Sequence, residues 1–334
     1  MKSAKSISSF IGLCFFRYLV GCTTLWTFGA IYFDAPLPGL GNLLLAVAWL
    51  AVLITGLRRV KGWRQRGSVW LAAFLLVMVP WWFKKPSNLR PWSPEFSHTP
   101  SAVIEGDIIT FRNFRNFDYQ QDGTPIERWE TRQFHLSKLR HMDFLMTYWG
   151  KGRLIGHPIF SFDFGEEGHV AFSIESRREK GEAYDLISGL YKQFELLYIV
   201  GSESDIVRCR TNFRVDENVY LYRLKIKETT VRLRFSEYVE SINRFAEKPA
   251  WYNVVTANCT TAVRGQITTG ERRSLDWRII ANGKLDELLN ERGILEKSLP
   301  FAELKRRSHI NPVAHKHPEP EGFSEVIRQA VPGF

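Results

Sequence analysis

Residues 37–57 read LPGLGNLLLAVAWLAVLITGL, a stretch without a single charged side chain. A membrane-spanning helix needs about 20 apolar residues, so this stretch predicts one span. Apolar stretches also lie on either side, at 10–33 and 68–83. The third is short, but it ends in Trp81-Trp82-Phe83, and aromatic side chains favour the membrane interface. We therefore predict a transmembrane region over residues 1–85 with three helices.

The first apolar stretch does not resemble a cleaved signal peptide. It is too long, has no small-residue cleavage site and is followed by another predicted span. Basic residues precede it and also fill the loop after the second span, whereas the loop between the first two spans has no Lys or Arg. Positive charge marks the cytoplasmic side. The prediction is a bacterial inner (cytoplasmic) membrane protein with a cytoplasmic N-terminus and a periplasmic C-terminal domain.

The remainder of the chain reads as a Pro- and Ser-rich linker over 86–100 and one globular domain over 101–334. The net charge is +10, but no block of Lys and Arg is interleaved with aromatic residues, so a nucleic-acid partner is not expected. The patterns predict an α+β domain. Strands are expected at 107–117, 128–136, 156–164, 168–177, 194–200 and 219–225, and helices at 137–149, 229–246, near Cys259 and at 285–292.

Cys259 is the best candidate nucleophile. The preceding helix is broken by Pro249, and a new helix is expected to start at Asn258-Cys259, with Asn258 shaping the turn. A thiol at a helix N-terminus is stabilised as the thiolate by the helix dipole, and nearby N–H groups can bind an oxyanion. A buried structural cysteine is the simpler alternative. A disulfide between Cys209 and Cys259 also stays open, because the predicted compartment is oxidising.

A nucleophilic cysteine needs a base, and histidine is the usual one. Alternation along two predicted strands places His157 and Glu175 on neighbouring polar faces. If a short glycine turn joins the strands, His157 lies about opposite Glu175, and His169 stays near the turn. His157 is therefore predicted as the base and Glu175 as the carboxylate that orients it, with His169 as the alternative base. A solvated His157 and a Glu175 paired with a neighbouring arginine are the simpler reading.

Several segments resemble one known family. They are Gly156-His-Pro-Ile-Phe-Ser-Phe-Asp-Phe, Val170-Ala-Phe-Ser-Ile-Glu, Gly181-Glu-Ala-Tyr, Phe194-Glu-Leu-Leu-Tyr, Val219-Tyr-Leu-Tyr and Trp251-Tyr-Asn, followed by Asn258-Cys-Thr-Thr. Between about Ile104 and Gly265 the chain resembles the Lnb N-terminal periplasmic domain family, which is lipoprotein N-acyltransferase-like. It also resembles permuted papain-like acyltransferases, in which His precedes an Asn-Cys motif. The resemblance implies a papain-like, NlpC/P60-like fold with an antiparallel sheet.

The resemblance further implies that Cys259 is the nucleophile and His157 the base, with Glu175 in a shared motif. Tyr184 is expected as an auxiliary polar contact. The implied chemistry is acyl transfer from a phospholipid to a lipoprotein through a thioester on the cysteine. One departure is the order of the parts, because the membrane helices here precede the domain instead of following it.

Three hypotheses follow. The first is a membrane-anchored cysteine acyltransferase or thioester-forming hydrolase, with a phospholipid acyl donor and a lipoprotein or other envelope acceptor. The second is a cysteine peptidase or amidase of the cell envelope. The third is a non-catalytic, membrane-anchored binding domain, which predicts a Cys259 that is buried or disulfide-bonded and far from His157. No cofactor is expected, because no Gly-rich phosphate loop occurs, and His315-Lys-His317 lacks the partners of a metal site.

Overall fold

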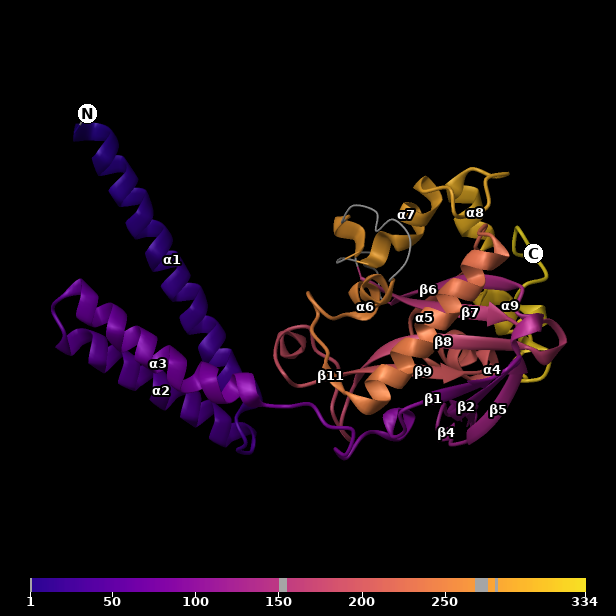
Figure 1. Ribbon diagram of the computed structural model, residues 1–334, viewed down its shortest axis with the longest axis horizontal. Helices are drawn as coiled ribbons and strands as arrows, with labels where there is room; N and C mark the ends of the chain where they lie inside the picture. The colour runs from indigo at the N-terminus through magenta and orange to yellow at the C-terminus, as the bar shows by residue number, and fades with distance from the viewer. Residues whose placement is uncertain (1, 150–154, 268–275, 280–281) are drawn as a thin grey trace. The chain divides into compact units, whose positions relative to one another are not determined.

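The computed structural model describes residues 2–149, 155–267, 276–279 and 282–334 (Figure 1). The chain divides into two compact units. The membrane unit comprises Met1–Pro86 together with Asp185–Phe194, and the globular unit comprises Ser87–Tyr184 and Glu195–Phe334. Each unit is described separately below.

The membrane unit contains three helices that are long and apolar enough to cross a membrane within the described residues. They are α1 (Lys2–Asp34), α2 (Gly39–Arg59) and α3 (Trp63–Phe83). Polar side chains join them: Asn42 Nδ2 donates to the Tyr32 and Ala35 carbonyls at 3.1 and 2.9 Å, and Trp49 Nε1 donates to Ala73 O at 3.1 Å. Such bonds suit helices in lipid, where water cannot replace them. Because α3 begins at Trp63 and not at the predicted Ser68, it reaches full spanning length.

The globular unit is an α+β domain built on one large, mainly antiparallel sheet. Among the described residues this sheet has nine strands, with the path β1-β2-β9-β8-β7-β6-β10, while β5 pairs with β2 and β11 with β9. The strands of the sheet are β1 (Ser101–Glu105), β2 (Ile108–Arg115), β5 (Trp129–His135), β6 (His141–Trp149), β7 (Gly156–Asp163), β8 (His169–Arg177), β9 (Glu195–Gly201), β10 (Glu217–Arg223) and β11 (Ala250–Trp251). A separate ribbon joins β3 (Asp118–Tyr119) to β4 (Pro125–Ile126).

Helices cover both faces of the sheet. On one face lies α5 (Glu228–Glu247), which crosses the strands (Figure 1) and places Phe235 and Tyr238 against Phe162, at 5.1 and 5.7 Å between ring centroids. On the other face, Leu145, Ile159 and Leu197 belong to an apolar cluster with residues of three helices. These helices are α4 (Glu203–Arg208), α9 (Asn311–Ala314) and α10 (Phe323–Val326). The remaining helices are α6 (Cys259–Gln266), α7 (Leu285–Glu291) and α8 (Phe301–Arg307).

The helix predicted at 137–149 is wrong, because these residues form a short 3-10 turn, Leu136–Lys138, followed by strand β6. All residues from Met142 to Tyr148 are buried. A strand covered on both faces has no polar face, so it lacks the alternation by which strands are recognised in a sequence. Its apolar run therefore resembled a helix.

Two stretches that were expected to be loose are packed into the globular unit. In the predicted linker, Trp92 and Phe96 are buried, and Arg177 Nε donates to Phe96 O at 2.8 Å. In the His- and Pro-rich tail, Ile310 is buried and His309 stacks on Tyr220, with 5.0 Å between ring centroids. Both stretches contain single large side chains that are buried in the core. These side chains do not recur with a helix or strand period, so the sequence pattern did not reveal them.

Candidate active site

Cys259 is the first residue of α6, and Asn258 caps that helix. The Asn258 Oδ1 atom accepts the backbone N–H of Thr260 at 3.0 Å and that of Thr261 at 2.9 Å. In return, Thr261 Oγ1 accepts the Asn258 N–H at 2.8 Å. Asparagine is among the strongest N-caps because its side chain satisfies amides that the helix leaves open. The backbone N–H groups of Thr260 and Thr261, which were expected to bind an oxyanion, are therefore already hydrogen-bonded to the cap. The N–H of Cys259 has no partner inside the helix.

His157 and Glu175 face each other from adjacent strands. The strands pair Ile159 with Ser173, so two residues further along each strand His157 lies opposite Glu175. His157 Nε2 is 3.2 Å from Glu175 Oε1, and both side chains are largely buried. Burial lowers the pKa of His157, but the charge of Glu175 together with interactions with Glu175 and Cys259 outweighs this effect, so the pKa is raised. Glu175 does not pair with the neighbouring Arg177, whose guanidinium binds carbonyls of Phe96 and Ser97.

Ser173 fixes which nitrogen of His157 carries a proton. Its hydroxyl donates to Glu175 Oε1 at 2.6 Å, and its oxygen lies 2.7 Å from His157 Nε2. The hydroxyl has one proton and an ionised carboxylate has none, so Nε2 must be the donor in this group. In neutral His157 the Nδ1 atom is therefore the one that can accept a proton.

Arg210 completes the charge balance around Glu175. Its Nη2 atom donates to Glu175 Oε1 at 2.7 Å, and its Nη1 atom donates to Glu217 Oε2 at 3.1 Å. Burial would raise the pKa of Glu175, but His157 and then Arg210 hold it well below its ordinary value. Glu175 is therefore ionised, held by hydrogen bonds from Ser173 and Arg210 and paired with His157, which is the condition for orienting an imidazole.

Two groups lie beside the Cys259 sulfur. The Cys259 thiol is near enough to His157 to contribute to the raised pKa of the imidazole. Asn282 Nδ2 donates to Cys259 Sγ at 3.1 Å, while Asn282 Oδ1 accepts the Gly156 N–H at 2.9 Å. Asn282 is itself buried. The sulfur thus has a base near it and an amide donor that is held by Gly156, the first residue of strand β7.

A pair of tyrosines adjoins the cysteine. Tyr184 and Tyr252 have their hydroxyl oxygens 3.4 Å apart. Burial is the main cause that raises the pKa of Tyr252, and the Cys259 thiol and Tyr184 add to it. Tyr184, the predicted auxiliary residue, thus reaches the site through Tyr252, whose phenol stays protonated.

His169 lies away from this cluster. It pairs with Asp163 at the turn between β7 and β8, six residues along the hairpin from the level of His157 and Glu175. At about 3.3 Å per residue this is on the order of 20 Å. The structure therefore separates His169 from Cys259, although the sequence left it open as a base.

The two cysteines of the globular unit are separate buried thiols, and no disulfide joins them. Cys259 is buried, as the binding-domain hypothesis expected, but it lies beside His157, against that hypothesis. In the described part of the chain, no three His, Cys, Asp or Glu side chains gather as a metal site requires.

Four residues of this site were not singled out from the sequence: Ser173, Arg210, Tyr252 and Asn282. Ser173 was visible on the same strand face as Glu175, and Tyr252 lies in the motif that was quoted for the resemblance. Arg210 is 35 positions from Glu175 and Asn282 is 23 positions from Cys259. Spacings of this size have no periodic signature, so no pattern in one sequence could have assigned them.

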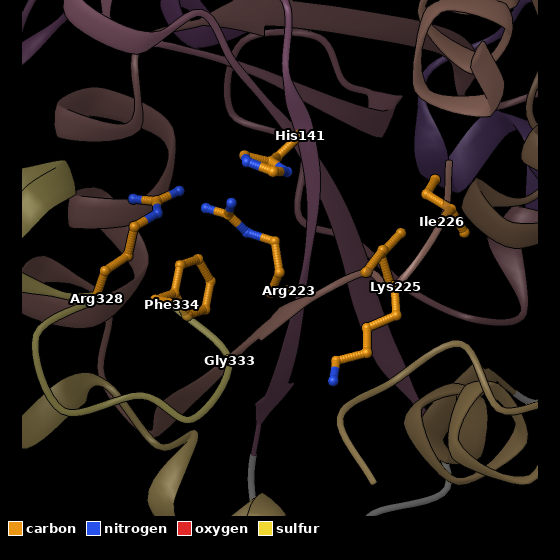
Figure 2. A pocket seen from close by; sticks show the side chains of 8 residues that line it. His141, Arg223, Lys225, Ile226, Arg328, Gly333 and Phe334 are labelled. Atoms are coloured by element: carbon orange, nitrogen blue, oxygen red, sulfur yellow. The ribbon is translucent and has the colours of Figure 1, made fainter. Parts of the chain in front are cut away.

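A pocket lies at the end of the β6–β7 hairpin that is far from His157, where His141 pairs with Asp163 (Figure 2). It is lined by Arg223, Arg328 and Phe334, with the Arg223 guanidinium 4.4 Å from the Phe334 ring centroid. Both arginines are already paired with the buried Asp143. The pocket contains none of the residues around Cys259, and its cations are used to hold the fold together.

The comparison with known proteins adds one family. Residues 126–283 match the family model described as the Lnb N-terminal periplasmic domain. This range includes His157, Glu175, Cys259 and Asn282. Neither a curated protein nor a solved structure matches the chain. In addition to three apolar helices, the chain therefore contains, over residues 126–283, a domain that matches the Lnb N-terminal periplasmic family, which indicates a membrane protein with a periplasmic domain.

Proposed function

We propose that the protein is a membrane-anchored cysteine acyltransferase, or a thioester-forming hydrolase, that takes an acyl chain from an envelope phospholipid. The observation that carries the proposal is the arrangement at Cys259: a thiol at a helix start, beside a histidine held by a carboxylate, with an amide donor on its sulfur. The order His157 before Asn258-Cys259 supports a papain-like, permuted arrangement. Three apolar helices keep the domain at a lipid surface.

In the acylation step, His157 Nδ1 takes the proton from Cys259 Sγ, and the thiolate attacks the ester carbonyl of the phospholipid. The raised pKa of His157 favours this proton transfer. The tetrahedral intermediate collapses when its carbon–oxygen bond breaks, and the leaving alkoxide receives the proton from the imidazolium. The products are a thioester on Cys259 and a lysophospholipid.

The oxyanion of that intermediate requires hydrogen-bond donors close to the sulfur. We assign this role to the side-chain amide of Asn282 and the backbone N–H of Cys259. Asn282 Nδ2 lies 3.1 Å from Sγ, and the amides of Thr260 and Thr261 are occupied by the Asn258 cap. An amide positioned beforehand costs little reorganisation during the reaction, which makes it an effective donor.

In the transfer step, an amine attacks the thioester carbonyl and His157 Nδ1 accepts the proton that the amine loses. The carbon–sulfur bond breaks, an amide forms and the thiolate is released. If water replaces the amine, the product is a free fatty acid. A lipoprotein amine is the proposed acceptor, and the proposed location is the bacterial inner membrane with a cytoplasmic N-terminus.

The proposal is tested with purified full-length protein in phospholipid vesicles, in which one phospholipid carries a fluorescent acyl chain. Label should appear on the wild-type protein and be released by hydroxylamine, but should be absent from Cys259→Ala and His157→Ala. The matched control is Cys209→Ala, which removes the other buried thiol of the globular unit and should keep the label. Label that persists in Cys259→Ala, or no label on folded protein with several phospholipids, would exclude the acyltransferase and favour an amidase or a binding domain.

A further inference from the structure

The segment Asp185–Phe194 joins β8 to β9 in the sequence, yet it belongs to the membrane unit. The link is the carboxylate of Asp34 at the end of α1. It accepts the Lys192 N–H at 3.0 Å and Gln193 Nε2 at 2.9 Å from this loop. It also accepts Trp81 Nε1 at 2.7 Å and Lys84 Nζ at 2.8 Å from the end of α3. A buried carboxylate is stable only with such partners, so Asp34 holds the loop against the helix ends.

Tyr191 of this loop packs against the side of α1, near the C-terminal end of that helix. The Tyr191 ring stacks on Phe33 with 5.0 Å between centroids and also approaches Trp26 at 6.2 Å. Gly29 makes room for it, since a Cβ atom there would lie 1.9 Å from the Tyr191 hydroxyl. Gly29 is five residues before Asp34, which is about 7.5 Å along a helix. Tyr191 therefore lies beside the outer part of a membrane span, and not above it.

The residues that precede Tyr191 expose apolar side chains. Leu186, Ile187 and Leu190 are 42%, 60% and 40% exposed, around the short 3-10 helix Ser188–Leu190. Three large aliphatic side chains within five residues are unusual on a surface that faces water. On the neighbouring helix ends, Trp82 and Phe83 are exposed to a similar or greater extent. The loop thus continues the apolar surface of the spans.

We propose that Leu186, Ile187 and Leu190 insert into the membrane leaflet on the side of the globular domain, and that Asp185–Phe194 is a lipid-contacting loop. The occupant is the bilayer and not another protein, because the adjoining Tyr191 is already packed beside Gly29 within a span. The loop follows directly after Tyr184, whose hydroxyl adjoins Tyr252 at the candidate site. The proposed leaflet contact is therefore directly joined, along the chain, to a residue that adjoins the candidate site.

Photocrosslinking tests the leaflet contact. A diazirine-bearing amino acid is placed at position 187 of the full-length protein in vesicles of phosphatidylethanolamine and phosphatidylglycerol, and lipid adducts are measured by mass spectrometry after irradiation. The control position is Val215, which is 86% exposed in the globular unit. Lipid adducts at 187 should exceed those at 215 at least tenfold, and position 186 should behave like 187.

Equal lipid yields at positions 187 and 215 would overturn the proposal. Adducts of twice the chain mass at 187, without lipid, would assign the surface to a second copy and would also overturn it. A second readout rests on the proposed function: Ile187→Glu should slow acyl labelling of Cys259 from vesicles at least tenfold, while alkylation of Cys259 by a soluble reagent is unchanged. Because crosslinking needs no acyl transfer, absence of labelling in every variant would count against the proposed function alone.

Discussion

Replacing Asn282 tests the role of the amide beside the nucleophile. Its side chain makes two contacts that can be separated: Nδ2 donates to Cys259 Sγ at 3.1 Å, and Oδ1 accepts the Gly156 N–H at 2.9 Å. Asn282→Asp has the same shape and keeps an acceptor for Gly156, but it has no amide donor for an oxyanion. Asn282→Ala removes both contacts.

The expected magnitude follows from these contacts. Loss of one oxyanion donor typically lowers kcat by about 10²–10³, which is roughly 2.7–4 kcal/mol of transition-state stabilisation. Leaving the buried Gly156 N–H without an acceptor costs about 1–3 kcal/mol of folding stability. Asn282→Ala should therefore lose both activity and stability. Asn282→Asp should lose activity but keep the acceptor for the Gly156 N–H, so its loss of stability reflects only the burial of a carboxylate.

The assay combines the rate of acyl transfer, thermal unfolding and alkylation of Cys259 by iodoacetamide. Alkylation forms no oxyanion, so it should be far less affected than acyl transfer in Asn282→Ala. In Asn282→Asp the new carboxylate beside Sγ disfavours the thiolate, so alkylation should slow as well. A fall in acyl transfer of less than about threefold in Asn282→Asp would refute the assignment of Asn282 as an oxyanion donor, because a donor contributes about 100-fold or more. A parallel loss of alkylation and acyl transfer in Asn282→Ala, whose new side chain is uncharged, would show instead that Asn282 only supports the fold around the thiol.

Three further changes have defined outcomes. Glu175→Gln removes the charge that raises the pKa of His157, so the acid limb of the activity profile, where His157 becomes protonated and can no longer accept the thiol proton, should move to lower pH; an unchanged limb would show that this carboxylate does not control His157. The same change should also reduce the free energy of unfolding, measured as a function of pH. The lowered pKa of Glu175 contributes stability above the unfolded pKa of Glu, and the raised pKa of His157 contributes stability below the unfolded pKa of His. The loss should therefore be largest between these two unfolded pKa values. Asn258→Ala should cost about 1 kcal/mol of unfolding free energy by loss of the helix cap, with Asn258→Ser as a control that restores most of it; equal stability of both variants would contradict the capping role. Arg328→Met should destabilise the globular unit by about 3–5 kcal/mol in chemical denaturation, because it leaves the buried carboxylates of Asp143 and Glu203 without their shared cation; a neutral effect would mean that these carboxylates are protonated.

Features with a local signature could be predicted from the sequence. Uninterrupted apolar stretches indicated three spanning helices, and the match to the Lnb N-terminal domain model confirms the family suspected from the motifs. Alternation along β7 and β8 also predicted that His157 would lie opposite Glu175, and the structure has these side chains 3.2 Å apart. Period-two alternation is informative here because a single turn fixes the register of the whole hairpin.

Features that depend on distant parts of the chain could not be predicted. Strand β6 is covered on both faces, so its residues carry no alternation. Arg210 and Asn282 reach the site through tertiary packing, from positions without a fixed spacing to Glu175 or Cys259. The contact between the Tyr191 loop and α1 could not be predicted either. Its one trace in the sequence is Gly29, a single glycine in an apolar helix.

The most direct test of the account is mass spectrometry of the Cys259 peptide after the full-length protein has been incubated with a single defined phospholipid. The account predicts one acyl chain on Cys259 that hydroxylamine removes, together with an equal amount of lysophospholipid. His157→Ala should abolish both products while Cys209→Ala retains them. An unmodified Cys259 peptide from folded protein, or an acyl chain that is found on other residues and survives hydroxylamine, would contradict the thioester mechanism.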